Sequence, residues 1–441
     1  MTRFEPAGPL RGTLVPPPDK SISHRAALFA AMSDEPVTIR DFLQAEDTIA
    51  TLDAIRSLGA GVETIGSDVL VRGVGLHTAQ AATGGMLDVR NAGTLLRLLP
   101  GWLAGQPGGW WTLTGDESIM RRPVDRVAEP LRRMGARIEA REGRLPPLTI
   151  QGGELTGAEH ELPMASAQVK SCLLIAGMLA EGETVVREPA ASRDHTERIL
   201  RRARVPFEQE GGTVRIRQVD ELELDGLAVP GDASSAAFAV AAAACIERSR
   251  IVIEDVGLNW TRTAFLRIAA RMGAVVLGDL EEPPPEGAAA AAGAFSPADE
   301  PVGELDVAAA PLEGTCVEGA EVPLAIDELP LVALLGCFAE GETVVRGAAE
   351  LRHKESDRIA AVVEGLGGLG ARIEALEDGF AVHGTGGLEG GTLDARGDHR
   401  MAMLGAVAGL ASRRGVEVVG MEAAAVSYPE FERDLGRLVE R

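Results

Sequence analysis

Ala180-Glu-Gly-Glu-Thr-Val-Val-Arg187 occurs a second time in this chain, as Ala339-Glu-Gly-Glu-Thr-Val-Val-Arg346. Each copy follows an apolar stretch, Ser166–Leu179 or Asp327–Phe338, that predicts a buried helix. The Gly between two Glu residues indicates a turn, and the Thr-Val-Val run after it favours a strand. The duplication therefore predicts a repeated unit of helix, turn and strand.

The pattern of polar start, apolar helix, Gly-containing turn and strand is found six times. Its copies are Ser21–Arg40, Asn91–Thr114, Ser166–Arg187, Ser234–Glu254, Asp327–Arg346 and Asp398–Val419. A second, amphipathic helix follows and commonly ends in Gly-Ala before a strand, as at Gly135-Ala136 and Gly273-Ala274. We therefore predict an α/β (α+β) fold of six βαβαββ units, with the first helix of each unit buried and parallel to the others.

Three units in each half give two pseudo-symmetric domains. We expect the first domain to span residues 17–229 and the second to combine residues 1–16 with residues 230–441, because the last unit ends without a closing strand. Two crossing segments make a hinge, so opening and closing of the domains is expected. The stretch 281–301, rich in Pro, Ala and Glu, breaks the fourth unit and is expected to be a flexible surface insertion.

The composition argues against several classes of protein. Of the 441 residues, 45% are hydrophobic, which is typical of a globular chain. The net charge of −23 argues against a nucleic-acid partner or an anionic-membrane surface. Neither a signal peptide nor a membrane-spanning run is expected. The four Cys residues lack metal-ligand or redox spacing, so we predict reduced thiols in a cytoplasmic protein.

Arg supplies nearly all of the positive charge, since only Lys20, Lys170 and Lys354 occur among 43 basic residues. A Lys in such a chain suggests a site that needs a compact, titratable ammonium. Lys354 lies in Leu351-Arg-His-Lys-Glu-Ser-Asp-Arg358. We expect residues 355–357 in the first turn of a helix, with Lys354 and Arg358 on one face. The alternative is a charged, solvated helix end.

Buried parallel helices expose only their ends, and a helix N-terminus attracts anions because its backbone N–H groups are free. Polar and basic residues gather at or near the predicted helix starts: Lys20, Ser21, Arg25, Asn91, Gly93, Arg97, Arg121, Arg122, Ser166, Gln168, Lys170, Arg193, Asp327, Lys354, Glu355, Arg358, Asp398 and Arg400. So many cations suggest at least two anionic groups held together. Asp327 and Glu355 are carboxylates where acid–base chemistry could occur.

Each of these residues also has a structural alternative. Asn91 and Ser166 suit N-caps, Gly93 suits a tight turn, and Arg25 and Arg97 could snorkel from apolar helices. Recurrence at the same place in five of the six repeats favours a functional role for the set.

Eight motifs in these positions resemble the EPSP synthase family, which makes 5-enolpyruvylshikimate 3-phosphate. They are Asp19-Lys-Ser-Ile-Ser-His-Arg25, Asn91-Ala-Gly-Thr94, Met120-Arg-Arg-Pro123, Ser166-Ala-Gln168, Ser192-Arg-Asp-His-Thr196, Gly231-Asp-Ala-Ser-Ser235, Lys354-Glu-Ser-Asp-Arg358 and Asp398-His-Arg-Met401. The motifs span almost the whole chain in the family's order.

The resemblance implies the enolpyruvyl transferase fold, an inside-out α/β barrel in each domain. It implies transfer of the carboxyvinyl group of phosphoenolpyruvate to the 5-hydroxyl of shikimate 3-phosphate by addition and elimination, with release of phosphate. This reaction of aromatic amino-acid biosynthesis would need no metal and no organic cofactor. A monomer is expected.

The resemblance also implies residue roles, carried over position by position. Shikimate 3-phosphate would be held by Lys20, Ser21, Arg25, Ser166, Ala167, Gln168, Ser192, Arg193, Asp327 and Lys354. Phosphoenolpyruvate would be held by Lys20, Asn91, Gly93, Arg122, Gln168, Arg358 and Arg400. Catalysis would fall to Asp327, which takes the proton of the 5-hydroxyl, and to Glu355 with Lys20, which protonate the methylene carbon.

Some positions depart from parts of the family. Ala167, His195 and Val426 stand where some members have Ser, Tyr and a phosphoenolpyruvate-contacting Lys. Gly93 is kept, with no methyl group to fill the space beside it, so we predict inhibition by glyphosate.

Two alternatives remain. The sister enzyme that transfers enolpyruvate to UDP-N-acetylglucosamine usually carries a Cys before the matching Arg-Pro and Lys-Asn at the first helix. This chain has Asp116–Met120 without Cys, and its first helix opens Lys20-Ser21. The other alternative is a catalytically inactive binding domain of the same fold, against which the presence of both Asp327 and Glu355 argues.

Overall fold

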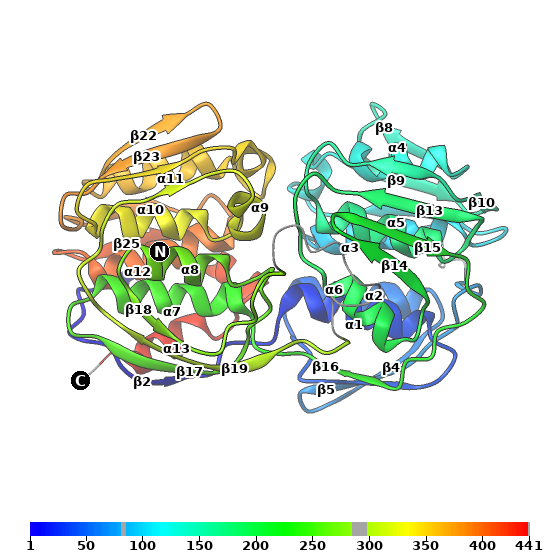
Figure 1. Cartoon of the computed structure of the whole chain (residues 1–441), viewed down its shortest axis with the longest axis horizontal. Coiled ribbons are helices and arrows are strands. Elements are labelled where there is room, and N and C mark those ends of the chain that lie inside the picture. Colours follow the sequence, from blue (N-terminus) through cyan, green and yellow to red (C-terminus); the bar gives the residue numbers. More distant parts are fainter. Residues whose placement is uncertain (81–84, 285–297, 440–441) are drawn as a thin grey trace. The chain divides into compact units, whose positions relative to one another are not determined.

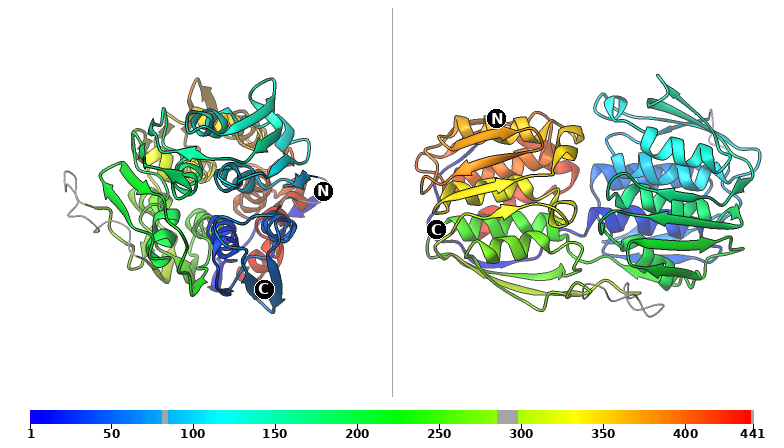
Figure 2. Two further views of the ribbon diagram at one scale, coloured as in Figure 1. Left: turned by 90° about the vertical axis from the view of Figure 1, so that its right-hand side faces the viewer. Right: turned by 45° about the horizontal axis from the view of Figure 1, so that its top comes forward.

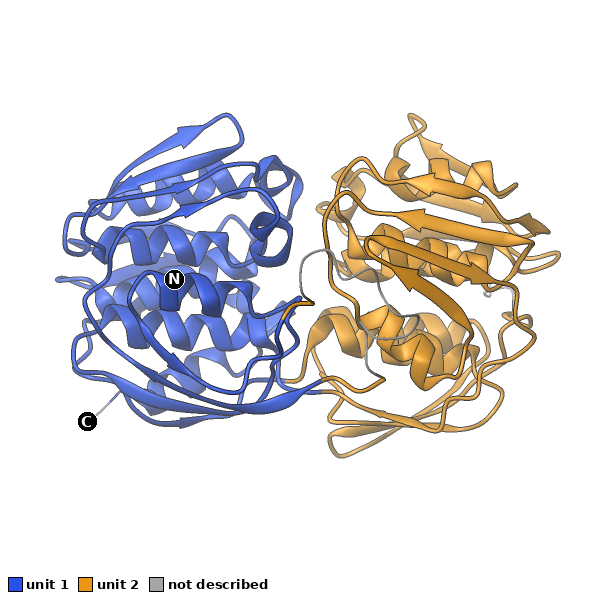
Figure 3. Ribbon diagram, viewed as in Figure 1, with its two compact units in different colours: residues 1–17, 230–282, 301–441 blue, residues 18–229, 283–300 orange. Residues whose placement is uncertain are grey.

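The computed structural model describes residues 1–80, 85–284 and 298–439 and divides into two compact units (Figure 3). Unit 1 comprises Met1–Pro17, Pro230–Glu282 and Pro301–Arg441, and unit 2 comprises Pro18–Val229 and Pro283–Glu300. The segment 283–300 is thus grouped with unit 2, although we expected 281–301 to be an insertion of the other domain. Residues 285–297 of this predicted insertion lie outside the described part.

Unit 2 contains three successive repeats, labelled in Figure 1. The first has α1 (Lys20–Met32), β3 (Val37–Arg40), α2 (Glu46–Ser57), β4 (Gly61–Ile65) and β5 (Asp68–Arg72). The second has β6 (Met86–Asp88), α3 (Gly93–Ala104), β7 (Trp110–Thr114), the 3₁₀ helix η2 (Ile119–Arg121), α4 (Asp125–Arg133), β8 (Arg137–Arg141) and β9 (Leu145–Gln151). The third has β10 (Leu155–Thr156), β11 (Glu159–Glu161), α5 (Ala167–Gly177), β12 (Ala180–Glu181), β13 (Glu183–Arg187), α6 (His195–Arg202), β14 (Phe207–Glu210) and β15 (Thr213–Arg217), followed by β16 (Gly226–Ala228).

Unit 1 begins with β1 (Thr2–Phe4) and β2 (Arg11–Leu14) and continues after unit 2. Its first repeat has α7 (Ala233–Cys245), β17 (Arg250–Gly257), α8 (Ala264–Arg271), β18 (Val275–Leu277) and β19 (Val302–Ala308). Its second has β20 (Cys316–Val317), α9 (Glu321–Ala325), α10 (Leu329–Phe338), β21 (Glu342–Val345), η3 (Ala349–His353), α11 (Arg358–Gly368), β22 (Arg372–Leu376) and β23 (Gly379–His383). The third has β24 (Gly391–Asp394), α12 (His399–Ala411), β25 (Val416–Val419), η4 (Met421–Val426) and α13 (Phe431–Leu438).

The sheets repeat one topology within the described residues. In β6-β7-β9-β8 the first pair is parallel, with Leu87 opposite Leu113, and the later pairs are antiparallel. The same order recurs in β11-β13-β15-β14, β20-β21-β23-β22, β16-β3-β5-β4 and β2-β17-β19-β18. A three-stranded sheet, β1-β25-β24, and a two-stranded parallel sheet, β10-β12, are also present. The predicted mixed α/β fold of repeated units is therefore confirmed.

Strands from distant parts of the chain complete three of these sheets, and in one of them β2 pairs in parallel with β17. The strand β16 pairs in parallel with β3, so the end of unit 2 closes its own first repeat. The strand β1 pairs antiparallel with β25, with Thr2 opposite Val418. The N-terminal strand thus supplies the closing strand that the last repeat lacks in sequence, as we predicted.

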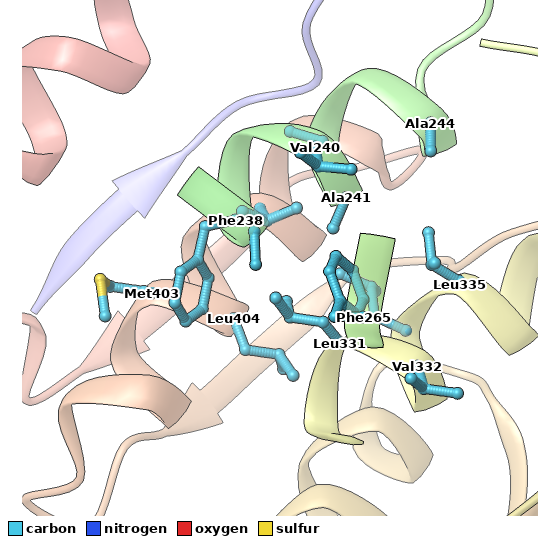
Figure 4. Packing of buried hydrophobic residues seen from close by; sticks show 14 of the residues in the cluster. Phe238, Val240, Ala241, Ala244, Phe265, Leu331, Val332, Leu335, Met403 and Leu404 are labelled. Atoms are coloured by element: carbon cyan, nitrogen blue, oxygen red, sulfur yellow. The ribbon is translucent and has the colours of Figure 1, made fainter. Parts of the chain in front are cut away.

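One helix of each repeat is almost entirely buried, namely α1, α3, α5, α7, α10 and α12. In α7, Ala233–Ala244 are all buried, and α7, α10 and α12 contact one another. Figure 4 shows how Phe238 of α7, Leu331 of α10 and Leu404 of α12 point into a shared core. In both units the strands lie outside and the helices inside (Figure 2). An apolar helix surface on every side is what such an interior requires.

A glycine brings α3 and α5 close together. A Cβ atom on Gly101 of α3 would lie 2.2 Å from the carbonyl oxygen of Cys172 in α5. Only a residue without a side chain allows this approach. Further along, Gln168 donates through Nε2 to Thr94 Oγ1 at 3.1 Å, so the starts of the two helices are neighbours.

We expect Gly101→Ala to push α3 and α5 apart and to destabilise the protein by about 1–3 kcal/mol, the usual cost of overpacking. The urea midpoint measures this effect. Gly436→Ala in α13 is the matched control, because nothing lies within 4 Å of the added Cβ and Ala favours a helix. Equal midpoints for both variants would show that the close approach is unimportant.

Candidate active site

Several buried helices begin with a side-chain cap. The capping residues that accept a backbone N–H are Asp19 for α1, Ser166 for α5, Asp232 for α7, Asp357 for α11 and Asp398 for α12. Ser166 is therefore an N-cap, as the structural alternative stated. A cap satisfies one N–H group and leaves others at the helix start for a ligand.

Asn91 is not a cap, since α3 is preceded by Ala92 at that position. Its amide nitrogen donates to Asp116 Oδ2 at 2.6 Å, and its oxygen accepts from Arg122 Nη2 at 3.3 Å. A Cβ on Gly93 would lie 2.4 Å from Arg122 Nη1. Asn91 thus holds the guanidinium of Arg122 near the start of α3, and Gly93 leaves room for it because it has no side chain. Arg122 is 7% exposed.

Arg25 is buried at 2% exposure, so it does not snorkel to the surface. Its guanidinium donates to Thr196 Oγ1 at 2.9 Å, Ser171 Oγ at 2.9 Å and the carbonyl oxygen of Ser21 at 3.0 Å. Burial, together with the nearby Arg193, lowers the pKa of Arg25 to about 10. The side chain therefore remains a fixed cation at neutral pH.

Lys20, the first residue of α1, pairs with Asp47 of α2 at 3.0 Å. Arg97 Nη1 donates to Gln168 Oε1 at 3.3 Å, and Ala167 is the first residue of α5. Ser166 and Ser192 both bond to Glu188. Unit 2 thus brings its predicted residues to neighbouring helix starts, but it adds two acids, Asp47 and Glu188, that the sequence did not single out.

The unit 1 residues form one cluster around Asp327. Its carboxylate lies 3.1 Å from Arg358 Nη1, 3.5 Å from Lys354 Nζ and 3.8 Å from Arg400 Nη2. Arg400 also donates to Glu328 Oε1 at 3.1 Å. Three basic residues predicted for the site, Lys354, Arg358 and Arg400, therefore lie around the predicted acid Asp327.

Arg358 is the centre of this cluster and is 1% exposed. It donates to Asp398 Oδ2 at 2.8 Å, Glu355 Oε2 at 2.5 Å and Asp327 Oδ1 at 3.1 Å. Burial opposes its charge, but these three acids outweigh burial and raise its pKa. Arg358 in turn overcomes the effect of burial on Asp398 and lowers the pKa of that carboxyl group.

The predicted helix register around Glu355 is wrong. The helix α11 starts at Arg358 with Asp357 as N-cap, while Lys354 is the C-cap that follows the 3₁₀ helix η3. Lys354 and Arg358 therefore do not share a helix face. Both still approach Asp327 Oδ1, because the break between the two helices lets the chain turn there.

The end of the predicted insertion is anchored within unit 2. Glu300 Oε1 lies 2.6 Å from His195 Nδ1, and Asp299 accepts from Arg202 Nη1 at 2.6 Å. The side chain of Glu300 is only 11% exposed. At the end of this segment Asp299 is exposed, with 78% of its side chain accessible, whereas Glu300 is mostly buried against His195 of α6.

A cavity of about 150 Å³ borders α4 and the segment 160–169. Ser166 lines it, but the other site residues do not.

Val426, at a position where some relatives carry Lys, is half-buried at the end of η4. Across residues 1–80, 85–284 and 298–439, no group of three or more His, Cys, Asp and Glu could hold a metal ion. In the same ranges, no helix has both the length and the hydropathy to cross a membrane.

Comparison with known proteins agrees with this geometry. The family model described as EPSP synthase (3-phosphoshikimate 1-carboxyvinyltransferase) matches residues 4–435. The chain belongs to the EPSP synthase family. The predicted family is thereby confirmed, and with it an enzyme that transfers an enolpyruvyl group in the shikimate pathway. The UDP-N-acetylglucosamine alternative is not favoured.

Relatives and solved structures cover nearly the whole chain. A 3-phosphoshikimate 1-carboxyvinyltransferase of Desulfitobacterium hafniense is 45% identical over 430 residues, which is 97% of this chain and 95% of the relative. One from Thermus thermophilus is 45% identical over 437 residues, 99% of this chain and 98% of the relative. The structure of EPSP synthase from Acinetobacter baumannii has a TM-score of 0.84 and 38% identity, covering 99% of this chain and 98% of the other.

His24, in the first family motif, predicts a pH effect on stability. Burial, followed by the charges of Lys20 and Arg25, lowers the pKa of His24 well below its ordinary value. The unfolded chain takes up a proton near pH 6.5, whereas the folded protein does not. Stability should therefore fall as the pH drops from about 6.5, by at most about 1.4 kcal/mol per pH unit from this group.

Urea midpoints between pH 7 and pH 5 test this expectation. His24→Gln should flatten the pH dependence, since the unfolded state loses its extra proton. His77→Gln changes an exposed histidine and is the control. A His24→Gln profile as steep as that of the unaltered protein would contradict the prediction.

Proposed function

We propose that Asp327 and Glu355 carry the proton transfers by which the enolpyruvyl group of phosphoenolpyruvate moves to the 5-hydroxyl of shikimate 3-phosphate. The observation that supports this most is their shared contact with Arg358, at 3.1 Å and 2.5 Å. One buried cation thus holds two carboxylates of different roles in fixed positions. General acid–base catalysis requires such placement.

In the addition step, the 5-oxygen bonds to C2 of phosphoenolpyruvate and its proton passes to Asp327. Glu355, with help from Lys20, gives a proton to the methylene carbon, which becomes a methyl group. In the elimination step, the bond from C2 to the phosphate oxygen breaks and Glu355 takes back a methyl proton. Fixed cations stabilise the charge that develops on the intermediate.

For shikimate 3-phosphate we propose that Ser21 and Arg25 hold the carboxylate. We propose that Ser166, the backbone of Ala167, Gln168, Arg193 and Lys354 hold the ring and the phosphate. Support comes from Arg25, whose three hydrogen bonds fix it beside the start of α5. A cation that is already ordered loses little entropy when it binds an anion.

For phosphoenolpyruvate we propose Lys20, Asn91, Gly93, Arg122, Gln168, Arg358 and Arg400. The support is the hydrogen bond from the guanidinium of Arg122 to Asn91, together with the room that Gly93 leaves for this guanidinium at the start of α3. Glyphosate, which carries a carboxylate and a phosphonate group, is proposed to inhibit by using the same cations. We also propose a monomer that works in the cytoplasm, where its four free thiols would stay reduced.

Replacing either carboxylate should stop turnover without unfolding the protein. We expect Asp327→Asn and Glu355→Gln each to lower kcat by about 10²–10⁴-fold, the range for general acid–base groups. Phosphate release in the presence of both shikimate 3-phosphate and phosphoenolpyruvate measures this. Glu364→Gln, an exposed acid on α11, is the matched control and should keep its activity.

The same assay separates the alternatives. Release with UDP-N-acetylglucosamine in place of shikimate 3-phosphate would overturn the proposed acceptor. No release with either acceptor would favour the inactive binding domain. Release that persists in both carboxylate variants would refute the acid–base roles.

Gly93→Ala tests the phosphoenolpyruvate site. The added methyl group must displace the guanidinium of Arg122, because the two would lie 2.4 Å apart. Loss of one aligned, charged hydrogen-bond donor typically weakens binding by about tenfold or more. We therefore expect higher values of KM for phosphoenolpyruvate and of the glyphosate inhibition constant. Gly153→Ala, with nothing within 4 Å, is the control; unchanged constants in Gly93→Ala would argue against this site.

A further inference from the structure

The carboxylate of Glu188 holds two separate segments of unit 2. Its Oε1 accepts from the backbone nitrogen of Ser166 at 3.0 Å, and its oxygens lie 2.7 and 2.9 Å from Ser192 Oγ. The side chain is 4% exposed. One buried acid therefore ties the start of α5 to the loop before α6, the loop that carries Arg193.

Lys170 forms an ion pair with Glu188 and so helps to fix the position of this carboxylate. Its ammonium lies 2.7 Å from Glu188 Oε2 and 2.7 Å from Glu197 Oε1. Lys170 and Glu197 are 5% and 0% exposed. Burial opposes the charge of Lys170, but Glu197 and Glu188 outweigh burial and raise its pKa. The triad thus consists of buried ionic side chains that no substrate role explains.

A second pair of side chains joins α5 and α6, next to Lys170 and Glu197 in sequence. Ser171 of α5 bonds to Thr196 of α6 at 2.6 Å, and both bond to Arg25. The pairs 170–197 and 171–196 therefore join α5 to α6 at two successive positions. One pair supports Arg25, and the other supports Glu188.

The single proton of its hydroxyl group limits the hydrogen bonds that Ser192 can donate. A serine hydroxyl has one proton, and a carboxylate beside it can only accept. A phosphate dianion also only accepts, so Ser192 cannot donate to Glu188 and to a phosphate at once. With its proton given to Glu188, Ser192 serves a substrate through the position of its loop.

We propose that Glu188 is a positioning residue for shikimate 3-phosphate: it fixes Ser166 and, through Ser192, the neighbouring Arg193, while Lys170 and Glu197 hold Glu188 in place. This inference rests on the proposed function, which assigns Ser166 and Arg193 to that substrate. It changes the expected role of Ser192 from contact to anchorage.

Steady-state kinetics of the full chain test the proposal. Glu188→Gln should raise KM for shikimate 3-phosphate by about 10–100-fold, the effect of losing charged hydrogen bonds. The values of kcat and of KM for phosphoenolpyruvate should stay within about threefold of those of the unaltered protein. The variant loses an interaction that stabilises bound substrate and transition state equally, so the chemical step keeps its rate. Glu183→Gln on β13 is the matched control, since it also breaks an ion pair, with Arg217, but the side chain of Glu183 is 33% exposed.

A double-mutant cycle separates anchorage from contact. If Ser192 acts through Glu188, Ser192→Ala should raise this KM, Ser192→Thr should keep it, and Ser192→Ala should add nothing to Glu188→Gln. Additive effects would show that Ser192 contacts the substrate and would overturn the proposal. Glu188→Asp, which keeps the charge but is too short to hold both segments, replaces Glu188→Gln in the cycle if that variant does not fold.

Two further outcomes are distinct. A lower melting temperature with unchanged KM in Glu188→Gln would make Glu188 merely structural and would overturn the inference alone. If Arg193→Ala leaves KM for shikimate 3-phosphate unchanged, the proposed phosphate contacts themselves are wrong, and the positioning role fails with them.

Discussion

The structure depends on helices that are apolar on every side and therefore have no polar face to offer. In α7 and α12 nearly every residue is buried, so the chemistry of each repeat is confined to the helix starts. Packing then brings those starts together. Ser234 of α7 donates to Glu328, before α10, and Arg400 of α12 donates to the same carboxylate. The packing that buries these helices thus also concentrates charged groups and free N–H groups at one end of each unit.

The sequence predicted the fold and most of the candidate residues because both follow from a local pattern. The segment Ala180–Arg187 and its copy reveal the repeat, and the polar starts of the repeats indicate the site. The scarcity of Lys was a useful signal, since Lys20, Lys170 and Lys354 all lie in ionic clusters with buried or half-buried acids. What could not be predicted were the acids that complete these clusters. With 66 Asp and Glu residues in the chain, no spacing indicates that Asp47 meets Lys20 or that Glu188 meets Lys170.

Local rules also failed where tertiary contacts override them. Asn91 is of a residue type that favours N-caps, yet its side-chain amide accepts a hydrogen bond from Arg122 instead. Residues 355–357 have the composition of a first helical turn, but η3 precedes them and moves the start of α11 to Arg358. The stretch 281–301 is rich in Pro, Ala and Glu, which is typical of a linker. Its composition does not indicate that Glu300 pairs with His195 and Arg198, because pairing with distant residues leaves no mark on local composition.

The charges around Arg358 bear on how the proposed reaction would begin. The cations of this cluster are already paired with carboxylates of the chain, so an anionic substrate must compete with Asp327 and Glu355 for them. In the proposed function the same cations must also stabilise the charge that develops on the intermediate. The addition step would therefore begin with an exchange of partners, in which anionic groups of the substrates take the place of Asp327 and Glu355 beside these cations.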